Sequence, residues 1–397
     1  MIFEQWESAA SDGDDDPHDV PGQTTMADIE LSVAHDFEDV RESWRQLQRS
    51  AVLTPFQSLE WAEAWYETIG RKRGFNLRIV TAEKAGRVVL LLPLVISTNR
   101  RLKRLTWIAG QWNDYNVPVI DVSEYARFSH LSAAEFWREV GRLVPEADLF
   151  CLPKQPREFG GRRNPFVLPG CLETDSAHAI ALDCTWEDFQ ERCSKSSRRR
   201  VRKKQNQLSR KGKVDYRLVE GAAERRQAVG LILKWKSDQL EARGARNPFE
   251  DREFSDFLQN LAEHWLNLQV HLLMLDGSPI AGVLALAEER SSIIYQMCFD
   301  PAHERQSPGR LLLEEMMHKH IQDGKAVLDF GYGDEPYKVK LTDKRMPLYR
   351  GLRGFGLSGR VACFAEKQKL QVERFIKSRR RLLQLYYTMR ARPSSIS

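Results

Sequence analysis

Apolar residues follow two different patterns between residues 292 and 340, and these patterns predict a strand, a turn, a helix and a second strand. Ile293–Phe299 is a run of apolar, β-branched and aromatic residues, as expected for a strand. After a turn at 300–309, apolar side chains recur at near-helical spacing in Arg310–Asp323, and a second strand-like run follows at Ala326–Phe330. The first N–H groups of such a helix have no partner within the helix, so the turn before it can hold an anionic group.

The rest of the chain mixes the same two periods. Strands are predicted at 29–33, 77–82, 87–96, 102–108, 148–153, 179–183, 214–219, 270–275 and 279–287. Helices are predicted at 37–51, after Ser58, at 131–143, after Thr185, and at 222–240, 250–268 and 360–390. The pair Asp276-Gly277 predicts a hairpin turn, and 348–359 is punctuated by glycines. This alternation predicts an α/β fold with a mixed sheet.

Length and composition suit a folded protein of more than one part. The chain has 397 residues, enough for two domains or one large one, and its hydrophobic content of 42% excludes global disorder. The first 28 residues are acidic and contain prolines, so we expect a disordered tail at 1–28. We expect an N-terminal domain at 29–165, a C-terminal domain at 166–350, and a basic C-terminal helix with a tail at 351–397.

The sequence indicates neither a metal site nor secretion. Its six cysteines are scattered, without a CxxC pair or a histidine cluster, so a zinc site and a disulfide framework are not expected. No apolar run approaches the ~20 residues that span a bilayer, and the N-terminus has no basic region followed by an apolar core. These features favour a cytoplasmic protein without a metal.

The strongest concentration of charge lies between Lys195 and Lys213, where ten basic residues occur without one acid. Three interpretations are open: a solvated helix face, a site for a phosphate-bearing ligand, or a nucleic-acid patch. The run has no interleaved aromatic residues, which argues against stacking on single-stranded bases.

The helix predicted at 360–390 is also basic, with apolar residues such as Phe364, Leu370 and Phe375 at intervals. A basic amphipathic helix can lie peripherally on an anionic membrane. It can equally pack against its own domain, and the sequence leaves both alternatives open.

Two central runs, FDPAHERQSPGRLLLEEM and LDFGYGDEPYKVKL, resemble the GNAT acyltransferases. In particular they are similar to the CelD-type, BioF-like acetyltransferases, which are related to the FemAB tandem-GNAT proteins. Weaker matches in the family's order lie at Pro55–Trp65, Leu90–Leu94, Asn113–Pro118 and Ser196–Val214. The loop departs from the usual GNAT pattern, because it has fewer glycines. The resemblance implies tandem GNAT-like domains and acyl-CoA, as acetyl-CoA, for the co-substrate.

The resemblance also implies roles for particular residues. The donor would be held at the predicted turn and strand, by Gln296, Arg305, Ser307, Gly309, Arg310 and Leu311. The segment after Phe330 combines carboxylates, a tyrosine and a lysine with two glycines, which allow close approach of a ligand. There we expect Asp334 or Glu335 as base, Tyr337 as proton donor to the leaving thiolate, and Lys338 as an anchor.

Four further residues are candidates for contact with the acceptor: Asp114, Tyr115, Trp235 and Asp329. For Asp114 and Tyr115 the alternative is an Asx-turn beside a packed tyrosine, and for Trp235 it is simple burial in the core.

Three functions therefore compete. The first is an acyltransferase that moves an acyl group from acyl-CoA to an amine of a sugar or cell-envelope precursor. The second is a FemAB-like transferase that uses aminoacyl-tRNA, in which case the basic run would contact RNA. The third is a non-catalytic GNAT scaffold in polysaccharide (cellulose) biosynthesis.

Overall fold

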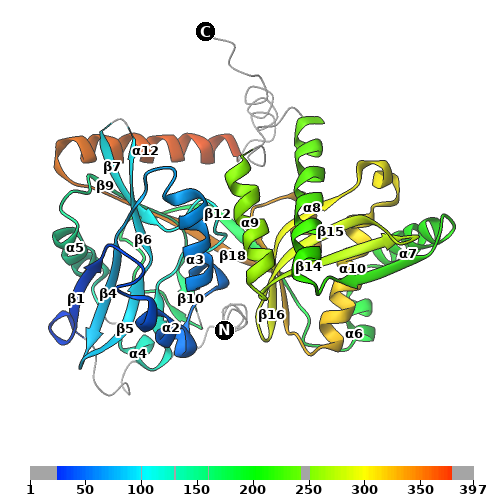
Figure 1. The fold of residues 1–397 in the computed structure, drawn as a ribbon, viewed down its shortest axis with the longest axis horizontal. Helices are drawn as coiled ribbons and strands as arrows, with labels where there is room; N and C mark the ends of the chain where they lie inside the picture. The colour runs from blue at the N-terminus through cyan, green and yellow to red at the C-terminus, as the bar shows by residue number, and fades with distance from the viewer. Residues whose placement is uncertain (1–24, 100, 129–130, 160, 243–250, 378–397) are drawn as a thin grey trace, which may run out of the picture. The chain divides into compact units, whose positions relative to one another are not determined.

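The computed structural model describes residues 25–99, 101–128, 131–159, 161–242 and 251–377 (Figure 1). The chain divides into two units. The first consists of residues 1–178, 332–340 and 344–374, and the second of 179–331, 341–343 and 375–397. The chain thus leaves the first unit and later returns to it. The domain limits expected from the sequence stay predictions, and most of the expected acidic tail lies outside the described residues.

One sheet of the first unit is antiparallel, with strand order β1-β4-β5-β8-β2. Its strands are β1 (Glu30–Ala34), β4 (Ile79–Lys84), β5 (Arg87–Leu92), β8 (Val119–Asp121) and β2 (Ala51–Val52). The stretch 87–96, predicted as one strand, is two, β5 and β6 (Leu94–Asn99), which separate at Pro93. Proline has no N–H to donate to a ladder, so it is a natural break.

A second group of strands in this unit has the order β18-β9-β7-β6-β3, in which β7 and β9 are parallel and the other neighbouring pairs are antiparallel. The remaining bounds are β3 (Asn76–Leu77), β7 (Leu102–Trp107), β9 (Leu149–Pro156) and β18 (Lys344–Gly354). Strand β12 (Leu172–Ala181) neighbours β18 and belongs to this unit as far as His178. No strand was predicted at β18, where glycines interrupt the apolar pattern, and only the end of β12 was predicted.

Helices of the first unit cover these strands through large aromatic side chains. They are α2 (Arg41–Ser50), α3 (Leu59–Trp65), α4 (Val122–Phe128), α5 (Ala133–Leu143), α11 (Pro336–Leu341) and α12 (Gly356–Lys377). Short turns of 3-10 or π helix lie at Met26–Asp28, Pro55–Gln57 and Tyr66–Gly70, and a small hairpin joins β10 (Glu158–Phe159) to β11 (Arg162–Arg163). Trp44, Trp61, Trp65 and Trp137 are each at most 1% exposed. The prediction that Ser58 caps α3 is confirmed, since its Oγ accepts from Trp61 N at 3.3 Å.

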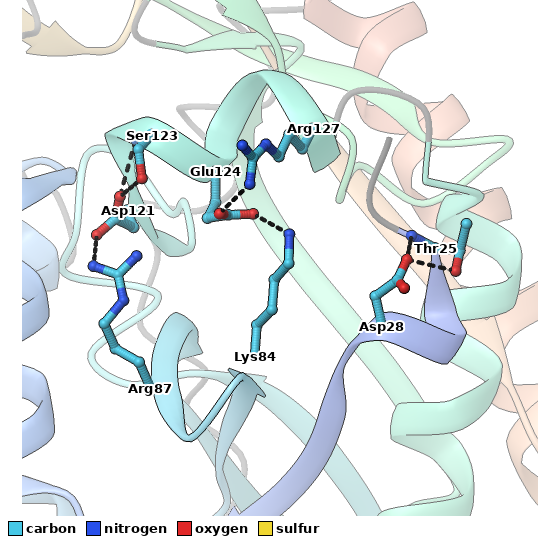
Figure 2. Close-up of polar contacts among 8 residues, drawn as sticks. All are labelled: Thr25, Asp28, Lys84, Arg87, Asp121, Ser123, Glu124 and Arg127. Carbon is cyan, nitrogen blue, oxygen red and sulfur yellow. Dashed lines mark hydrogen bonds and ion pairs between the residues drawn. The ribbon is translucent and has the colours of Figure 1, made fainter. Parts of the chain in front are cut away.

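Ion pairs tie the β4–β5 hairpin to the junction of β8 and α4 (Figure 2). Lys84 donates to Glu124 at 2.9 Å, and Arg87 to Asp121 at 3.0 Å. Burial acts to raise the pKa of Asp121, but hydrogen bonds from Ser123 and Ser50 and the charge of Arg87 outweigh it and hold this pKa below its usual range. These contacts fix the register of the hairpin against the start of α4.

The second unit contains the predicted strand–turn–helix–strand segment. Its strand order is β13-β14-β15-β16-β17, antiparallel except for the parallel pair β16 and β17. The bounds are β13 (Val214–Leu218), β14 (Leu268–Leu275), β15 (Ser278–Ala287), β16 (Ser291–Phe299) and β17 (Val327–Tyr332). The predicted hairpin turn is confirmed: Asp276 and Gly277 have φ of 48° and 79°, the left-handed pair that a tight hairpin requires.

Helices pack on both faces of this sheet. The helices are α6 (Trp186–Arg192), α7 (Lys195–Ser209), α8 (Ala222–Ala242), α9 (Arg252–His264) and α10 (Pro308–Gln322), with a 3-10 turn, η6, at Pro301–Gln306. Ala281 and Val283 of β15 share a core cluster with Leu312 of α10. Gly282 points the other way, because a Cβ there would lie 2.4 Å from Ile232 of α8. Successive residues of a strand face opposite sides, so α8 and α10 cover opposite faces.

No described helix is long and apolar enough to cross a membrane. Of the helix predicted at 360–390, the described part is α12, and the rest lies outside the described residues. The six cysteines are all free thiols.

Candidate functional site

The turn from β16 into α10 carries most of the residues predicted to hold a donor. Ser307 is the N-cap of α10 and has a left-handed backbone, with φ 53°. Strained non-glycine positions of this kind cluster at ligand sites. Gly309 and Leu311 are buried in the first turn of α10, whereas Arg305 is exposed on η6. The helix begins at Pro308, two residues earlier than predicted.

Beside this turn, β16 and β17 part from each other. Their parallel pairing, as the described strands show it, runs over Ser291–Ile293 against Val327–Asp329. On the other side, β16 has a bulge against β15, with Leu284 opposite Gln296 and Ala285 opposite Ile294. A bulge re-aims side chains and bends a strand away from its neighbour. The second half of β16, which includes Gln296, therefore offers backbone groups to an extended ligand.

Charge at the turn favours an anion. The guanidinium of Arg310 forms an ion pair with Glu314, one helical turn further on. Among the described residues, no acceptor lies within hydrogen-bond distance of buried Arg310 Nη1. The amino group of Lys204, from the basic helix α7, donates to the carbonyl of Arg305. A buried guanidinium nitrogen without an acceptor has a large desolvation cost, which a phosphate oxygen would relieve.

A cavity of about 800 Å³ lies in the same unit, between α6, α7 and α10. Its lining includes Arg198, Arg199 and Arg202 from the basic run and Glu314 from α10. Buried Arg198 Nε likewise has no acceptor among the described residues. The basic run is thus a helix of which one side lines a cavity.

The first unit contains a second constellation, which we call the polar cluster: Asp114, Lys154, Tyr332, Glu335, Tyr337 and Lys338. Its first member lies in the loop 113–116, whose two asparagines are buried and pin the loop. Asn113 accepts from Trp61 Nε1 at 2.8 Å and donates to Asn116 at 2.8 Å. Asn116 in turn donates to the Pro153 carbonyl at 3.0 Å. These bonds fix the backbone on both sides of Asp114.

The carboxylate of Asp114 is held in a partly enclosed environment. Burial raises the pKa of Asp114 to about 6, against the opposing effects of Lys154, Lys338 and the backbone N–H of Tyr332. Burial also lowers the pKa of Lys154, against the charge of Asp114. A carboxylate whose pKa lies near neutrality can take up and release a proton under ordinary conditions.

Lys154 is itself unusual. Its backbone is left-handed, with φ 55°, although it is not a glycine. Its amino group donates to the carbonyl oxygens of Asn113 and Gln111 at 2.6 and 3.1 Å, and lies 4.1 Å from the ring centre of Tyr332. The ammonium is therefore held in place by the same loop that carries Asp114.

The segment after β17 supplies the rest of the polar cluster. Lys338 is 7% exposed, donates to the Tyr332 carbonyl at 2.6 Å, and pairs with Glu335 at 3.1 Å. Tyr337 is 37% exposed, and burial of its hydroxyl raises the pKa of Tyr337. Gly333 has φ 112°, and a Cβ there would lie 2.7 Å from the Glu335 carboxylate. The tight path of this segment therefore requires a glycine.

Asp334 has a different environment from that of Asp114. Its carboxylate accepts hydrogen bonds from Ser176 Oγ and, at 2.8 Å, from His178 Nε2. Arg345 Nε in turn donates to Ser176 Oγ at 3.2 Å. Partial burial acts to raise the pKa of Asp334, but the hydrogen bonds from Ser176 and His178 outweigh it and hold this pKa below its usual range.

Three of the residues predicted to contact an acceptor are buried. Tyr115 is 1% exposed and packs against Phe56, with ring centres 6.2 Å apart. Trp235 of α8 is 6% exposed. Asp329 is fully buried, and its carboxylate accepts from Gly331 N at 2.7 Å, which shapes the end of β17. The burial of Tyr115 and Trp235 agrees with the packing alternatives for these two residues, and Asp114 is the one member of this set that is not classed as buried.

Sequence patterns did not mark Lys154, Tyr332, Ser176 or His178 as site residues. Nothing in the sequence near Lys154 marks it, because its neighbours Asp114 and Tyr332 are distant in the chain. Ser176 and His178 lie on the part of β12 that was not predicted as a strand. No group of three or more histidine, cysteine, aspartate or glutamate residues in the described part of the chain is placed to hold a metal.

Comparison with known proteins agrees with this geometry. Residues 195–339 match the family model described as "Acetyltransferase (GNAT) domain". The chain is also similar to the crystal structure of FemX, with a TM-score of 0.52 and 11% identity over 80% of this chain and 96% of that one. It is similar to a conserved protein of unknown function from Bacteroides thetaiotaomicron, with a TM-score of 0.50 and 9% identity over 81% of this chain and 99% of that one. No curated protein matches the sequence.

These comparisons show a GNAT-related fold that carries an acetyltransferase domain, and they support an acyltransferase. The predicted fold class, a mixed α/β architecture of the GNAT type, is confirmed. The likeness to FemX covers far more of the chain than the matched domain does, so it includes residues of both units.

Proposed function

We propose that this protein transfers an acyl group, in the first instance acetyl, from acyl-CoA to an amine of a sugar or of a cell-envelope or polysaccharide precursor. One observation carries the proposal. Within the matched GNAT domain, β16 and β17 part beside the turn into α10, where Arg310 keeps a buried nitrogen without an acceptor among the described residues.

The residues at the turn fit the donor. A CoA pyrophosphate would accept from Arg310 and lie at the positive end of the α10 dipole. Lys204 and Arg305 would add to the positive field around it. The thioester chain would extend along the exposed edge of β16, past Gln296, where backbone groups can hold its amides and polarise its carbonyl.

Proton transfer is assigned to the polar cluster. An amine reaches the protein as an ammonium and must lose a proton before its lone pair attacks the thioester carbonyl. We assign this step to Asp114, because its pKa of about 6 lets it accept a proton near neutrality. A C–N bond forms and the C–S bond breaks. The departing thiolate takes a proton from Tyr337, the surplus proton on the new amide nitrogen returns to Tyr337, and Asp114 releases its proton to solvent. The products are the amide, free CoA and one proton released to solvent.

The other members of the cluster have supporting roles in this proposal. Lys338 anchors the segment through the Tyr332 carbonyl, and Lys154 limits the rise in the pKa of Asp114 that burial causes. Asp334 and Glu335, first considered as bases, are instead assigned to positioning, because each is engaged by a neighbour.

Isothermal titration with CoA and with acetyl-CoA tests donor binding. We expect saturable binding by the intact protein, weakened about tenfold or more in Arg310→Gln, since a charge-assisted hydrogen bond contributes about 1.5–3 kcal/mol. Gly309→Trp should abolish binding by filling the turn. Arg226→Gln is the matched control. It removes an arginine of α8 that pairs with Glu263 of α9 at 2.6 Å, outside the turn. No binding of either ligand by the intact protein would contradict the proposal.

One observation favours a second donor, aminoacyl-tRNA. The basic run forms the helix α7, and three of its arginines line the cavity beside α10. Binding to RNA should then fall steeply with salt, and Arg199→Gln with Arg202→Gln should reduce that slope. Acyl transfer from acetyl-CoA in the absence of RNA, together with unchanged acetyl-CoA binding by this double variant, would favour acyl-CoA as the donor. If Asp114→Asn and Tyr337→Phe both kept full function, a non-catalytic scaffold would be favoured instead.

We place the enzyme in the cytoplasm.

A further inference from the structure

The two long faces of α12 differ in what they contact. One face packs on the first unit: Cys363 and Leu370 are 8% and 3% exposed and share a cluster with Leu149, Cys151 and Leu352. Glu366, on the same side, pairs with Arg104 at 2.9 Å. The helix is therefore already anchored to its own unit, and its other face is not needed for that purpose.

The opposite face is apolar and open to solvent. Leu357, Val361, Phe364 and Val372 are 82%, 62%, 65% and 56% exposed. At about 100° per residue these four positions fall within roughly 80° of the helix circumference, so they form one stripe. We call it the apolar stripe of α12. Single exposed apolar residues are ordinary, but a contiguous row along one helix indicates a contact surface.

The charges beside the stripe have one sign. Arg360, Lys367 and Arg374 recur every seven residues along one flank, and Lys369 lies on the other. The two acids of this helix, Glu366 and Glu373, fall towards the packed side by the same spacing. The surface that α12 presents therefore combines large apolar side chains with cations at its borders.

We propose that α12 lies flat on an anionic lipid surface, with the apolar stripe among the acyl chains nearest the headgroups and the flanking cations against lipid phosphates. A helix with an apolar face bordered by Lys and Arg binds anionic membranes in this way. A second copy of the chain fits the surface less well, because pairing two such faces would bring like-charged flanks together. In this proposal the helix packs on its own unit through one face and contacts the membrane through the opposite face. The proposal does not depend on the chemistry of acyl transfer.

Co-sedimentation of the full-length protein with lipid vesicles tests this. Vesicles of phosphatidylcholine are compared with vesicles that also contain phosphatidylglycerol, at low and high salt. We expect binding that requires phosphatidylglycerol and weakens with salt. The double variant Val361→Glu/Phe364→Glu should bind at least tenfold more weakly, while its melting temperature stays close to that of the parent, because both side chains are exposed.

Two controls separate this surface from general adhesion of a basic protein. Leu266→Glu changes an apolar residue that is 75% exposed elsewhere, between α9 and β14, and should bind as the parent does. Arg360→Glu/Lys367→Glu should lose most of the binding, whereas the charge-matched pair Arg200→Glu/Lys203→Glu, on α7, should keep it. Binding of Val361→Glu/Phe364→Glu equal to the parent would overturn the proposal. So would sedimentation equilibrium that shows a dimer which this variant dissociates, since the stripe would then be an interface between copies.

Discussion

Asp114 and Asp334 are both carboxylates of the first unit, and their surroundings shift their pKa values in opposite directions. Asp114 is enclosed, and its pKa is raised to about 6 in spite of two nearby lysines. Asp334 accepts hydrogen bonds from Ser176 and His178, and its pKa is held low. A general base needs a pKa near the working pH, so Asp114 suits proton transfer. An anchoring residue needs a stable charge, so Asp334 suits positioning.

This difference leads us to propose another base than the sequence interpretation did. The sequence places Asp334 beside Glu335, Tyr337 and Lys338, which suggested a base within that segment. The structure brings Asp114 to the same cluster from a loop more than two hundred residues earlier in the chain. Proximity along the chain is therefore a weaker guide to a proton-transfer group than the environment of each carboxylate.

The largest expected effect is on turnover. Replacing Asp114 by Asn should lower kcat by about 10²–10⁴, the usual contribution of a general base, with little change in acetyl-CoA affinity. Steady-state kinetics with an amine acceptor measures this. In the parent, kcat/KM should rise with pH through about 6 and then level, because the carboxylate must be unprotonated to act. Turnover of Asp114→Asn within a few-fold of the parent would remove the role assigned to Asp114.

The next prediction distinguishes Asp334 from Asp114 by how each contributes to the free energy of unfolding. Replacing Asp334 by Asn should lower the free energy of unfolding at pH 7 by about 1 kcal/mol, since its hydrogen bonds are charge-assisted but half-exposed. A depressed pKa contributes stability above about pH 4 that is lost as pH falls through the folded pKa.

The raised pKa of Asp114 acts with the opposite sign, because the folded state then binds its proton more tightly than the unfolded state does. Its contribution to stability falls as pH rises from about 4 to about 6, and Asp114→Asn should remove that fall. Urea unfolding of both variants at pH 4 and pH 7 checks the two signs. Parallel pH dependence in the two variants would show that the environments are not opposed.

A smaller effect is expected from Lys154→Met, which removes a cation that favours the charged form of Asp114. The acidic limb of the pH–rate profile should move above pH 6, because the carboxylate then holds its proton more tightly. Lys72→Met, on an exposed turn in the same unit, is the control and should leave the limb in place. A limb that shifts to lower pH would mean that Asp114 is not the titrating group.

The smallest effect on catalysis is expected from Trp61→Phe, which deletes the 2.8 Å hydrogen bond to Asn113 but keeps an aromatic ring in the core. We expect a loss of stability of about 1–3 kcal/mol, because the Asn113 oxygen loses a buried donor, and a reduction in kcat of only a few-fold. Thermal melting and the same kinetic assay measure the two quantities. A reduction in kcat as large as that of Asp114→Asn would show that the loop, more than the carboxylate, limits the reaction.

Local signals in the sequence were enough to predict several elements of both units. The run at 293–299, the Asp276-Gly277 turn and the caps at Ser58 and Thr185 each reflect interactions between near neighbours, and the structure contains all four. No strand was predicted at β18, whose pairing with β9 overrides the weak strand propensity of its glycines.

The candidate site also shows that contacts between distant segments are harder to predict than local ones. The β16–α10 turn could be predicted because one contiguous segment forms it. The electrostatic interaction of Asp114 with Lys154, and the hydrogen bonds of Asp334 with Ser176 and His178, could not, because they join segments between about 40 and 160 residues apart in the chain. The roles assigned to these residues stay predictions until the variants above are measured.

The return of the chain to the first unit has a consequence for how the protein is made. Residues 332–340 and 344–374, which supply Lys338, β18 and α12, emerge from the ribosome only after the second unit has been synthesised. Since domains tend to fold as they emerge, residues 179–331 of the second unit can fold while the first unit still lacks β18 and the helices α11 and α12. Ribosomes that stop before residue 344 would therefore release a chain with an exposed β9 edge, which is a template for aggregation.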